Sequence, residues 1–240
     1  ERLKDYLGSN HIEIQNKCIH APFGYGEVRR CLKISVDDLL REYRKYIGNN
    51  QILVQEKFDY RSLQSNDEGV VYNNFKAKNI IFCEGPSVVN NPFFPTEKIK
   101  GNKGEYLIIQ APALKLNKMI KGPVYLIPIG EDRYKVGATF AHDDDSWDTT
   151  ERAKEELLEG LKKILKCDFE VVGQTAGIRA TTFDRHPLIG KVKPGISFLS
   201  GLGTRGFLMA PALGRMLVSH IEENTVIPEE MDINRPVSYR

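Results

Sequence analysis

The chain has 240 residues, of which 41% are hydrophobic and 28% charged, as expected for a globular protein with one large or two smaller domains. Its 34 basic and 32 acidic residues leave a net charge of +2 without a long run of like charge, so neither nucleic acid nor a membrane surface is an expected partner. No apolar stretch approaches the roughly 20 residues that span a bilayer, and four scattered cysteines favour the reducing cytoplasm over a disulfide or zinc framework.

The first third of the chain predicts a helix followed by two strands. In ISVDDLLREYRKYIG, residues 34–48, apolar side chains recur at helical spacing, Ser35 or Asp37 could cap the start, and Gly48 could end the helix. QILVQEKFDY, residues 51–60, has the composition of a strand. KAKNIIFCEG, residues 76–85, predicts a buried strand that ends in a turn at Gly85. This order is typical of the closing part of an α/β unit.

The middle of the chain has a different character. PSVVNNPFFP, residues 86–95, is rich in proline and asparagine and predicts a loop or crossover. Three β-rich runs follow at residues 104–112, 122–130 and 131–141, and the last two predict a hairpin that turns at Gly130–Asp132. We therefore expect an antiparallel sheet here.

The last part returns to helices and longer strands. A helix is predicted over about residues 149–166, with Asp148 and Glu151 as a capping box. DFEVVGQTAGIRATT, residues 168–182, predicts a long strand, and ISFLS, residues 196–200, another. A glycine turn and a helix over about residues 207–222 close the pattern. The sequence predicts two interleaved domains rather than one.

The glycine turn has the spacing G-x-G-x-x-G at Gly201, Gly203 and Gly206. A self-contained dinucleotide site also needs a parallel strand after the helix, with an acidic residue on it, and the sequence does not provide one. Glycines before a helix N-terminus still allow backbone N–H groups to approach a polar ligand. The alternative is a tight strand-to-helix connection without a ligand.

A second candidate is Arg179, which lies in mid-strand among small and apolar residues. Its guanidinium suits an anionic partner, and a carboxylate can bind it with two hydrogen bonds. The partner could be a ligand, or Asp184 or another acid in a structural ion pair. The three aspartates of AHDDDSWD, residues 141–148, fit a solvated loop before the next helix better than a calcium site.

Two motifs together resemble the C-terminal signature of the D-amino-acid oxidase-like (DAO) family of FAD-dependent oxidoreductases. That family includes glycine oxidase, sarcosine oxidase and the oxidase half of a bifunctional tRNA wobble-uridine modifying protein. The motifs are GIRATTFDRHPLIG and LSGLGTRGFLMAPALGRMLVSHI, at residues 177–190 and 199–221. Weaker similarities at residues 76–88 and 122–140 extend the resemblance over roughly residues 30–225.

The resemblance implies an α/β fold, with α+β character in the substrate domain. It assigns residues 31–85 and 181–240 to the remainder of a FAD-binding domain, and residues 1–30 and 86–180 to a substrate-binding domain. It implies an enzyme that oxidises the C–N bond of a small amine or amino-acid substrate with FAD. Some family members attach the flavin to a cysteine near the glycine turn, but no cysteine follows Cys167 here, so we expect the FAD to be noncovalent. Arg179 would be the catalytic contact, and the cofactor contacts would be Gly85, Gly203, Thr204, Arg205, Gly206 and Phe207.

The family's N-terminal β-α-β unit, which carries its pyrophosphate-binding G-x-G-x-x-G, has no counterpart in these residues. We therefore expect a truncated family member that holds FAD weakly or not at all by itself. Two alternatives remain at this stage. The chain could be a flavin-free binding module that keeps the substrate pocket, or part of an oxidase that acts on a modified tRNA nucleoside.

Overall fold

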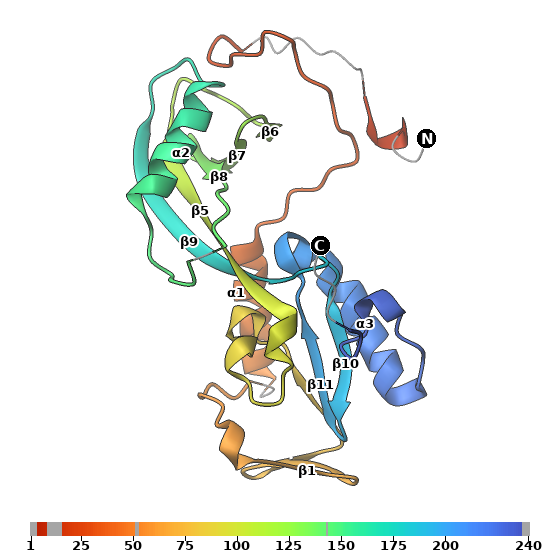
Figure 1. The fold of residues 1–240 in the computed structure, drawn as a ribbon. Coiled ribbons are helices and arrows are strands. Elements are labelled where there is room, and N and C mark those ends of the chain that lie inside the picture. Colours follow the sequence, from red (N-terminus) through yellow and green to blue (C-terminus); the bar gives the residue numbers. More distant parts are fainter. Residues whose placement is uncertain (1–3, 9–15, 51–52, 143, 237–240) are drawn as a thin grey trace. The chain divides into compact units, whose positions relative to one another are not determined.

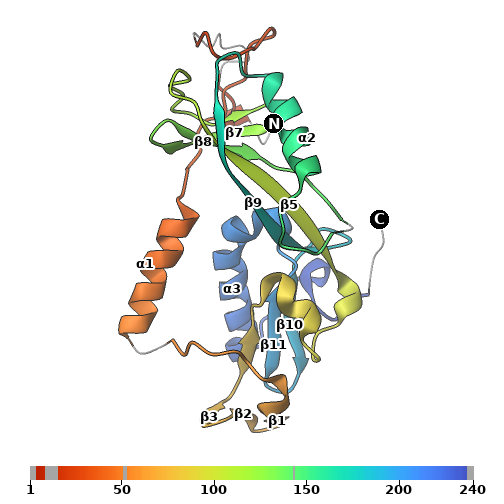
Figure 2. The same ribbon diagram turned by 90° about the vertical axis from the view of Figure 1, so that its left-hand side faces the viewer.

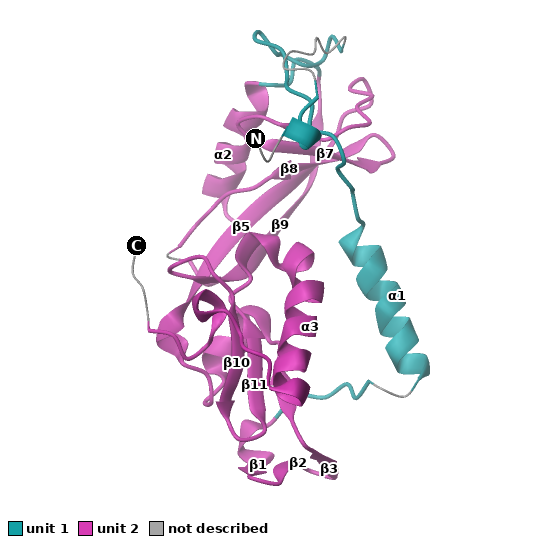
Figure 3. Ribbon diagram, turned by 90° about the vertical axis from the view of Figure 1, so that its right-hand side faces the viewer, with its two compact units in different colours: residues 1–58, 164–167 teal, residues 59–163, 168–240 magenta. Residues whose placement is uncertain are grey.

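The computed structural model describes residues 4–8, 16–50, 53–142 and 144–236. The chain divides into two compact units, which Figure 3 distinguishes by colour. The first comprises residues 1–58 and 164–167, and the second residues 59–163 and 168–240. The second unit contains all the strands of the described part and two of its three α-helices.

The first unit contains the helix α1 (Val36–Asn49) and a short 3₁₀ helix, η1 (Lys4–Tyr6). Ser35 caps α1, because its hydroxyl accepts a hydrogen bond from the backbone N–H of Asp38. The predicted helix is confirmed, although it continues through Gly48 to Asn49. No residue of α1 is buried. The strand predicted over residues 51–60 is wrong for residues 53–60, which form none, while residues 51–52 lie outside the described part.

An antiparallel sheet of order β6-β7-β8-β5-β9 dominates the second unit (Figure 1). Its strands are β5 (Ile99–Gln110), β6 (Ile120–Lys121), β7 (Tyr125–Gly130), β8 (Arg133–Gly137) and β9 (Glu170–Thr182). The predicted β7–β8 hairpin is confirmed. Its two central residues, Glu131 and Asp132, both have positive φ, the requirement of a type I′ turn.

The helix α2 (Glu151–Lys162) covers one face of this sheet (Figure 2). It buries Leu157 and Leu161, and at Gly160 it approaches Val124 so closely that a methyl group there would clash. Thr150 caps the helix, since its hydroxyl accepts a hydrogen bond from the backbone N–H of Ala153. The predicted helix is confirmed, but its predicted cap, Asp148, is wrong.

A smaller sheet of order β10-β11-β4 packs against the helix α3 (Gly206–Glu223). Its strands are β4 (Ile80–Phe82), β10 (Leu188–Lys193) and β11 (Ile196–Ser200), and β4 runs parallel to β11. Ile189 and Leu199 of the sheet form a buried cluster with Leu213 and Leu217 of α3. On the sheet's other face, Phe82 stacks on Phe198. This mixture of helices with parallel and antiparallel strands is the predicted fold class.

A three-stranded antiparallel meander, absent from the sequence expectations, precedes β4. Its strands are β1 (Leu63–Asn66), β2 (Gly69–Tyr72) and β3 (Phe75–Ala77). The remaining elements of this unit are the 3₁₀ helices η2 (Tyr60–Ser62), η3 (Gly85–Asn90), η4 (Thr96–Lys98), η5 (Gly203–Arg205) and η6 (Glu229–Met231). Within the described part of the chain, no helix has the length and hydropathy to cross a membrane.

Candidate functional site: an arginine beside a glycine turn

Arg179 lies near the end of β9, directly opposite Asn102 of β5. Its Nη1 donates to the backbone and side-chain oxygens of Asn102, at 3.4 and 3.5 Å. These contacts are long, so they hold the guanidinium only loosely. The Arg179 side chain is half-buried, and this burial lowers its pKa. The guanidinium is therefore a partly desolvated cation on a rigid strand.

Phe140 and Gly104 lie on two further sides of the guanidinium. The Phe140 ring lies against it, with 4.9 Å between Cζ and the ring centroid, which is the geometry of a cation–π contact. Gly104 of β5 provides the room on another side. A Cβ built at Gly104 would lie 2.1 Å from Nη2 and 2.3 Å from Nη1 of Arg179. The arginine thus occupies the space that a side chain at position 104 would need.

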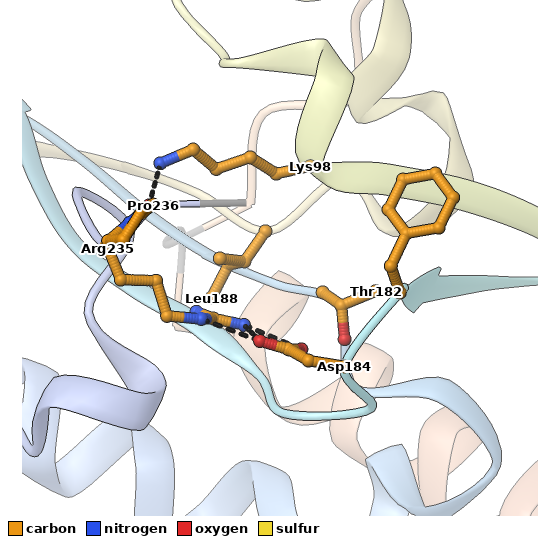
Figure 4. Close-up of a pocket in the computed structure, with 7 residues that line it drawn as sticks. Lys98, Thr182, Asp184, Leu188, Arg235 and Pro236 are labelled. Atoms are coloured by element: carbon orange, nitrogen blue, oxygen red, sulfur yellow. Dashed lines mark hydrogen bonds and ion pairs between the residues drawn. The ribbon is translucent and has the colours of Figure 1, made fainter. Parts of the chain in front are cut away.

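No carboxylate among the described residues lies within 4.0 Å of the Arg179 guanidinium. Asp184, the ion-pair partner considered from the sequence, binds Arg235 instead, through two hydrogen bonds of 2.9 Å (Figure 4). Burial alone would raise the pKa of Asp184, but bonds from the His186 N–H and Arg235 outweigh it and lower the pKa. The alternative in which Asp184 pairs with Arg179 is therefore wrong, because the Asp184 carboxylate is bound by Arg235.

The glycine turn follows β11 and leads into η5 and α3. Gly201 and Gly203 have φ of +70° and +55°, so a side chain would be strained at both positions. Neither Leu202, which precedes η5, nor Arg205, which precedes α3, makes a side-chain capping bond. No side chain therefore caps the start of η5 or of α3, and the helix dipole favours negative charge there.

The fold brings this turn to the strand that carries Arg179. Leu202 forms a β-bridge with Thr181, which is two residues after Arg179 and on the same face of β9. A Cβ at Gly203 would lie 3.2 Å from Cγ2 of Thr181, so the two segments are in close contact. Of the other predicted turn residues, Gly206 is half-buried, whereas Thr204, Arg205 and Phe207 are exposed.

Gly85 lies at the same edge of the smaller sheet as the glycine turn. Because β4 and β11 are parallel, their carboxyl ends, followed by Gly85 and Gly201, meet at one edge. Ligands of open α/β sheets bind at this edge. Gly85 has a φ of +57°, and a Cβ there would meet nothing within 4 Å. Open glycine backbone and uncapped N–H groups fit the polar edge of a flavin, so the residues present are compatible with FAD.

The sequence expectations missed three residues that surround the guanidinium: Asn102, Gly104 and Phe140. A signal existed for Gly104, since glycine within a strand often marks the close approach of another group. Nothing in the sequence pointed to Phe140, because its contact depends on the backbone pairing of Thr139 and Ala141 with β5, more than 30 residues earlier.

Of the three aspartates predicted to lie in a solvated loop, Asp145 is exposed, as expected, and Asp143 lies outside the described residues. Asp144 binds the buried Lys103 rather than only solvent, and no metal-binding cluster occurs among the described residues.

A family model described as FAD-dependent oxidoreductase (DAO) matches residues 30–220, and the chain belongs to this family. Among curated relatives, the bifunctional protein MnmC of tRNA 5-methylaminomethyl-2-thiouridine biosynthesis from Idiomarina loihiensis is 28% identical over 155 residues, 62% of this chain and 25% of the relative. A putative thiamine biosynthesis oxidoreductase, ThiO, from Rhizobium etli is 28% identical over 122 residues, 48% of this chain and 37% of the relative.

Solved structures show the same fold. Glycine oxidase from Geobacillus kaustophilus matches with a TM-score of 0.71 at 20% identity, covering 90% of this chain and 60% of that enzyme. Iminodiacetate oxidase from Chelativorans sp. BNC1 matches with a TM-score of 0.60 at 19% identity, covering 86% and 58%. The chain therefore spans less than two thirds of the length of each of these proteins.

Proposed function

We propose that the chain contributes the substrate-binding site and part of the flavin site of an enzyme that oxidises the C–N bond of an amine or amino acid. The observation that carries this proposal is a partly buried arginine, without an acidic partner among the described residues, beside a glycine turn with uncapped N–H groups. The names of the structural relatives support it, since glycine and iminodiacetate each combine an amine with a carboxylate.

In this proposal Arg179 is the catalytic residue that binds and orients the substrate carboxylate. A bidentate, charge-assisted contact would fix the substrate with its C–N bond toward the glycine turn. Phe140 and the backbone at Gly104 keep water from part of the guanidinium, which strengthens the contact. When bound, FAD supplies a two-electron acceptor, so that the substrate becomes an imine that water hydrolyses.

We assign the flavin contacts to Gly85 and to Gly203, Thr204, Arg205, Gly206 and Phe207. The backbone N–H groups at the start of α3 would donate to the flavin and stabilise the negative charge that reduction places there. Residues 31–85 and 181–240 form the cofactor-binding part in this proposal, and residues 1–30 and 86–180 the substrate-binding part. The FAD pyrophosphate would need a segment outside these 240 residues. A cytoplasmic location belongs to the same proposal.

The test is a carboxylate titration of the full chain, with acetate as the probe and the Arg179 Nε–H resonance in NMR as the signal. Arg179→Ala removes a charge-assisted contact worth about 1.5–3 kcal/mol, so acetate affinity should fall roughly 10- to 150-fold. Arg152→Ala removes the same charge from an exposed position on α2 and should leave binding unchanged. Because Arg179→Ala has no Arg179 Nε–H, a backbone resonance of the glycine turn is the signal for that variant. Equal affinity in wild type and Arg179→Ala would refute the role of Arg179.

A second candidate is oxidation of a modified tRNA nucleoside. It is favoured by the several curated relatives named for tRNA 5-methylaminomethyl-2-thiouridine biosynthesis. A net charge of only +2 does not favour it, because tRNA binding needs a basic surface. In the FAD-bound protein, turnover of glycine but not of a methylaminomethyl nucleoside would support the amino-acid proposal. Failure of the FAD-loaded protein to oxidise any amine would favour a binding module without flavin chemistry.

A further inference from the structure

A buried group of charged side chains lies across β5 from Arg179. Lys103 is 1% exposed and Glu105 is 3% exposed. Residues 102 and 104, which contact Arg179, alternate with 103 and 105 along the strand, so the two sets point to opposite faces of the sheet. This second face is the one that α2 covers, and neither charged residue contacts the Arg179 guanidinium.

Lys103 binds the segment that connects β8 to α2. Its Nζ donates to Oδ2 of Asp144 at 2.6 Å and to Oγ of Ser146 at 3.0 Å. Its backbone N–H and C=O both pair with Ala141, at 2.9 Å each. The hydrogen bonds from Lys103 and Ser146 lower the pKa of Asp144 to about 2, so this carboxylate is ionised at any pH near neutrality. Lys103 therefore holds the segment at three of its residues.

Glu105 holds the two ends of the same segment. Its backbone N–H donates to Oγ1 of Thr139, and its backbone C=O accepts from the Thr139 N–H. Its carboxylate accepts from the N–H and the hydroxyl of Thr150, both at 2.8 Å, and from Gln174. These donors satisfy the Glu105 carboxylate, whose Oε1 lies 3.9 Å from Nζ of Lys103. The ammonium of Lys103 therefore remains available to Asp144.

Phe140, which lies between the anchored Thr139 and Ala141, contacts the Arg179 guanidinium. Its ring is 60% exposed, so packing by its own surroundings does not fix it. We propose that Lys103 is a positioning residue: by binding Asp144 and Ser146 it holds Phe140 over the Arg179 guanidinium and so raises the affinity of Arg179 for a carboxylate. This inference rests on the proposed function of Arg179.

The chain contains one tryptophan, and it reports on this segment. Trp147 follows Ser146 and is 62% exposed. Its fluorescence anisotropy therefore measures how firmly the segment is held. Asp144→Asn removes the ionic contact of Lys103, and Asp148→Asn makes the same charge change at an exposed position four residues later. We expect Asp144→Asn to lower the anisotropy and Asp148→Asn to leave it at the wild-type value.

The decisive measurement is acetate affinity in the full chain, by the same NMR titration. Asp144→Asn should weaken binding about two- to five-fold, the effect of losing a cation–π contact, and Phe140→Ala should do the same. The double variant should be no weaker than Phe140→Ala, because Asp144 acts through Phe140. Asp144→Glu, which can restore the contact to Lys103, should recover part of the affinity. If Lys103→Met folds, it should lose as much acetate affinity as Asp144→Asn. If Lys103→Met does not fold, Asp144→Asn alone provides the test.

The outcomes separate this inference from the proposed function. If acetate binds wild type but not Arg179→Ala, and Asp144→Asn binds as tightly as wild type, the positioning role is overturned and Arg179 keeps its role. Additive losses in the double variant would also overturn it, since they would show that Asp144 acts independently of Phe140. If acetate does not bind wild type, both the proposed function of Arg179 and this inference fail.

Discussion

Replacing Gly104 by alanine should separate ligand binding from stability. The new Cβ would lie 2.1 to 2.5 Å from Nη2, Nη1 and Cζ of Arg179, well inside contact distance. The guanidinium must move, and it can, because it is the end of a long side chain with loose contacts to Asn102. Alanine also suits a strand better than glycine by about 0.5–1 kcal/mol. Stability should therefore change little.

Ligand binding should respond much more strongly. A displaced guanidinium loses both its contact with Phe140 and its orientation toward the carboxylate. The loss should approach that of a charge-assisted contact, about 1.5–3 kcal/mol, or roughly a 10- to 150-fold fall in acetate affinity. NMR titration measures the affinity, and urea unfolding measures the stability.

Gly177 provides a matched control, because it lies directly opposite Gly104 in the β5–β9 pair. A Cβ at Gly177 would meet nothing within 4 Å. Gly177→Ala should therefore keep wild-type affinity. The reasoning would be refuted if Gly104→Ala bound acetate as tightly as wild type. It would also be refuted if Gly177→Ala lost as much affinity, since the effect would then belong to the strand and not to the arginine.

Three further variants test interactions that hold the site in place. Asp184→Asn should lower the free energy of unfolding by about 3 kcal/mol at pH 7, because it leaves Arg235, which is 8% exposed in the native pair, without its anion. Folding lowers the pKa of Asp184, so the difference in unfolding free energy between wild type and Asp184→Asn should shrink as the pH falls below about 4. A difference that did not change with pH would contradict an ion pair between Asp184 and Arg235. Thr150→Val should cost about 2 kcal/mol through the lost cap of α2, whereas Thr150→Ser should retain most of the stability in urea unfolding. Burial and the hydrogen bond to Glu84 raise the pKa of Tyr60 to about 12. In a pH titration followed by phenolate absorbance, Tyr60→Phe should therefore lack the one tyrosine that titrates near that value. The stability that this contact contributes should be lost as the pH rises from about 10 to 12.

The sequence predicted those helices and strands whose structure depends on residues close together in the chain. The helices α1 and α2, the β7–β8 hairpin and the strand β9 all follow from spacing, capping or turn residues close in the sequence. The meander β1–β3 was missed because its strands are only three or four residues long and carry few buried side chains. Thr150 replaced Asp148 as the cap because Glu105, 45 residues earlier, binds both the N–H and the hydroxyl of Thr150.

In the candidate site, too, only features that depend on nearby residues could be predicted from the sequence. Arg179 and the glycine turn could be selected from the sequence, since each has an unusual residue type in a recognisable position. The partner of Asp184 could not, because Arg235 lies 51 residues away and no local pattern links them. The aspartates at 143–145 gave no sign that Asp144 faces a buried lysine, which is rare because an unpaired buried charge is costly.

The charges of Lys103 and Arg179 lie on opposite faces of β5, because side chains alternate between the two faces of a strand. On the α2 side, Lys103 meets Asp144 and Ser146, so its buried charge is compensated within the chain. On the other side, Asn102 accepts two long hydrogen bonds from Arg179 and Gly104 leaves room for its guanidinium, and neither residue carries a charge. A one-residue shift of β5 would exchange the faces and place the charged side chains of Lys103 and Glu105 on the side of Arg179. In the proposed function, the antiparallel register of β5 and β9 is therefore what keeps these charges away from Arg179 and leaves it to the substrate carboxylate.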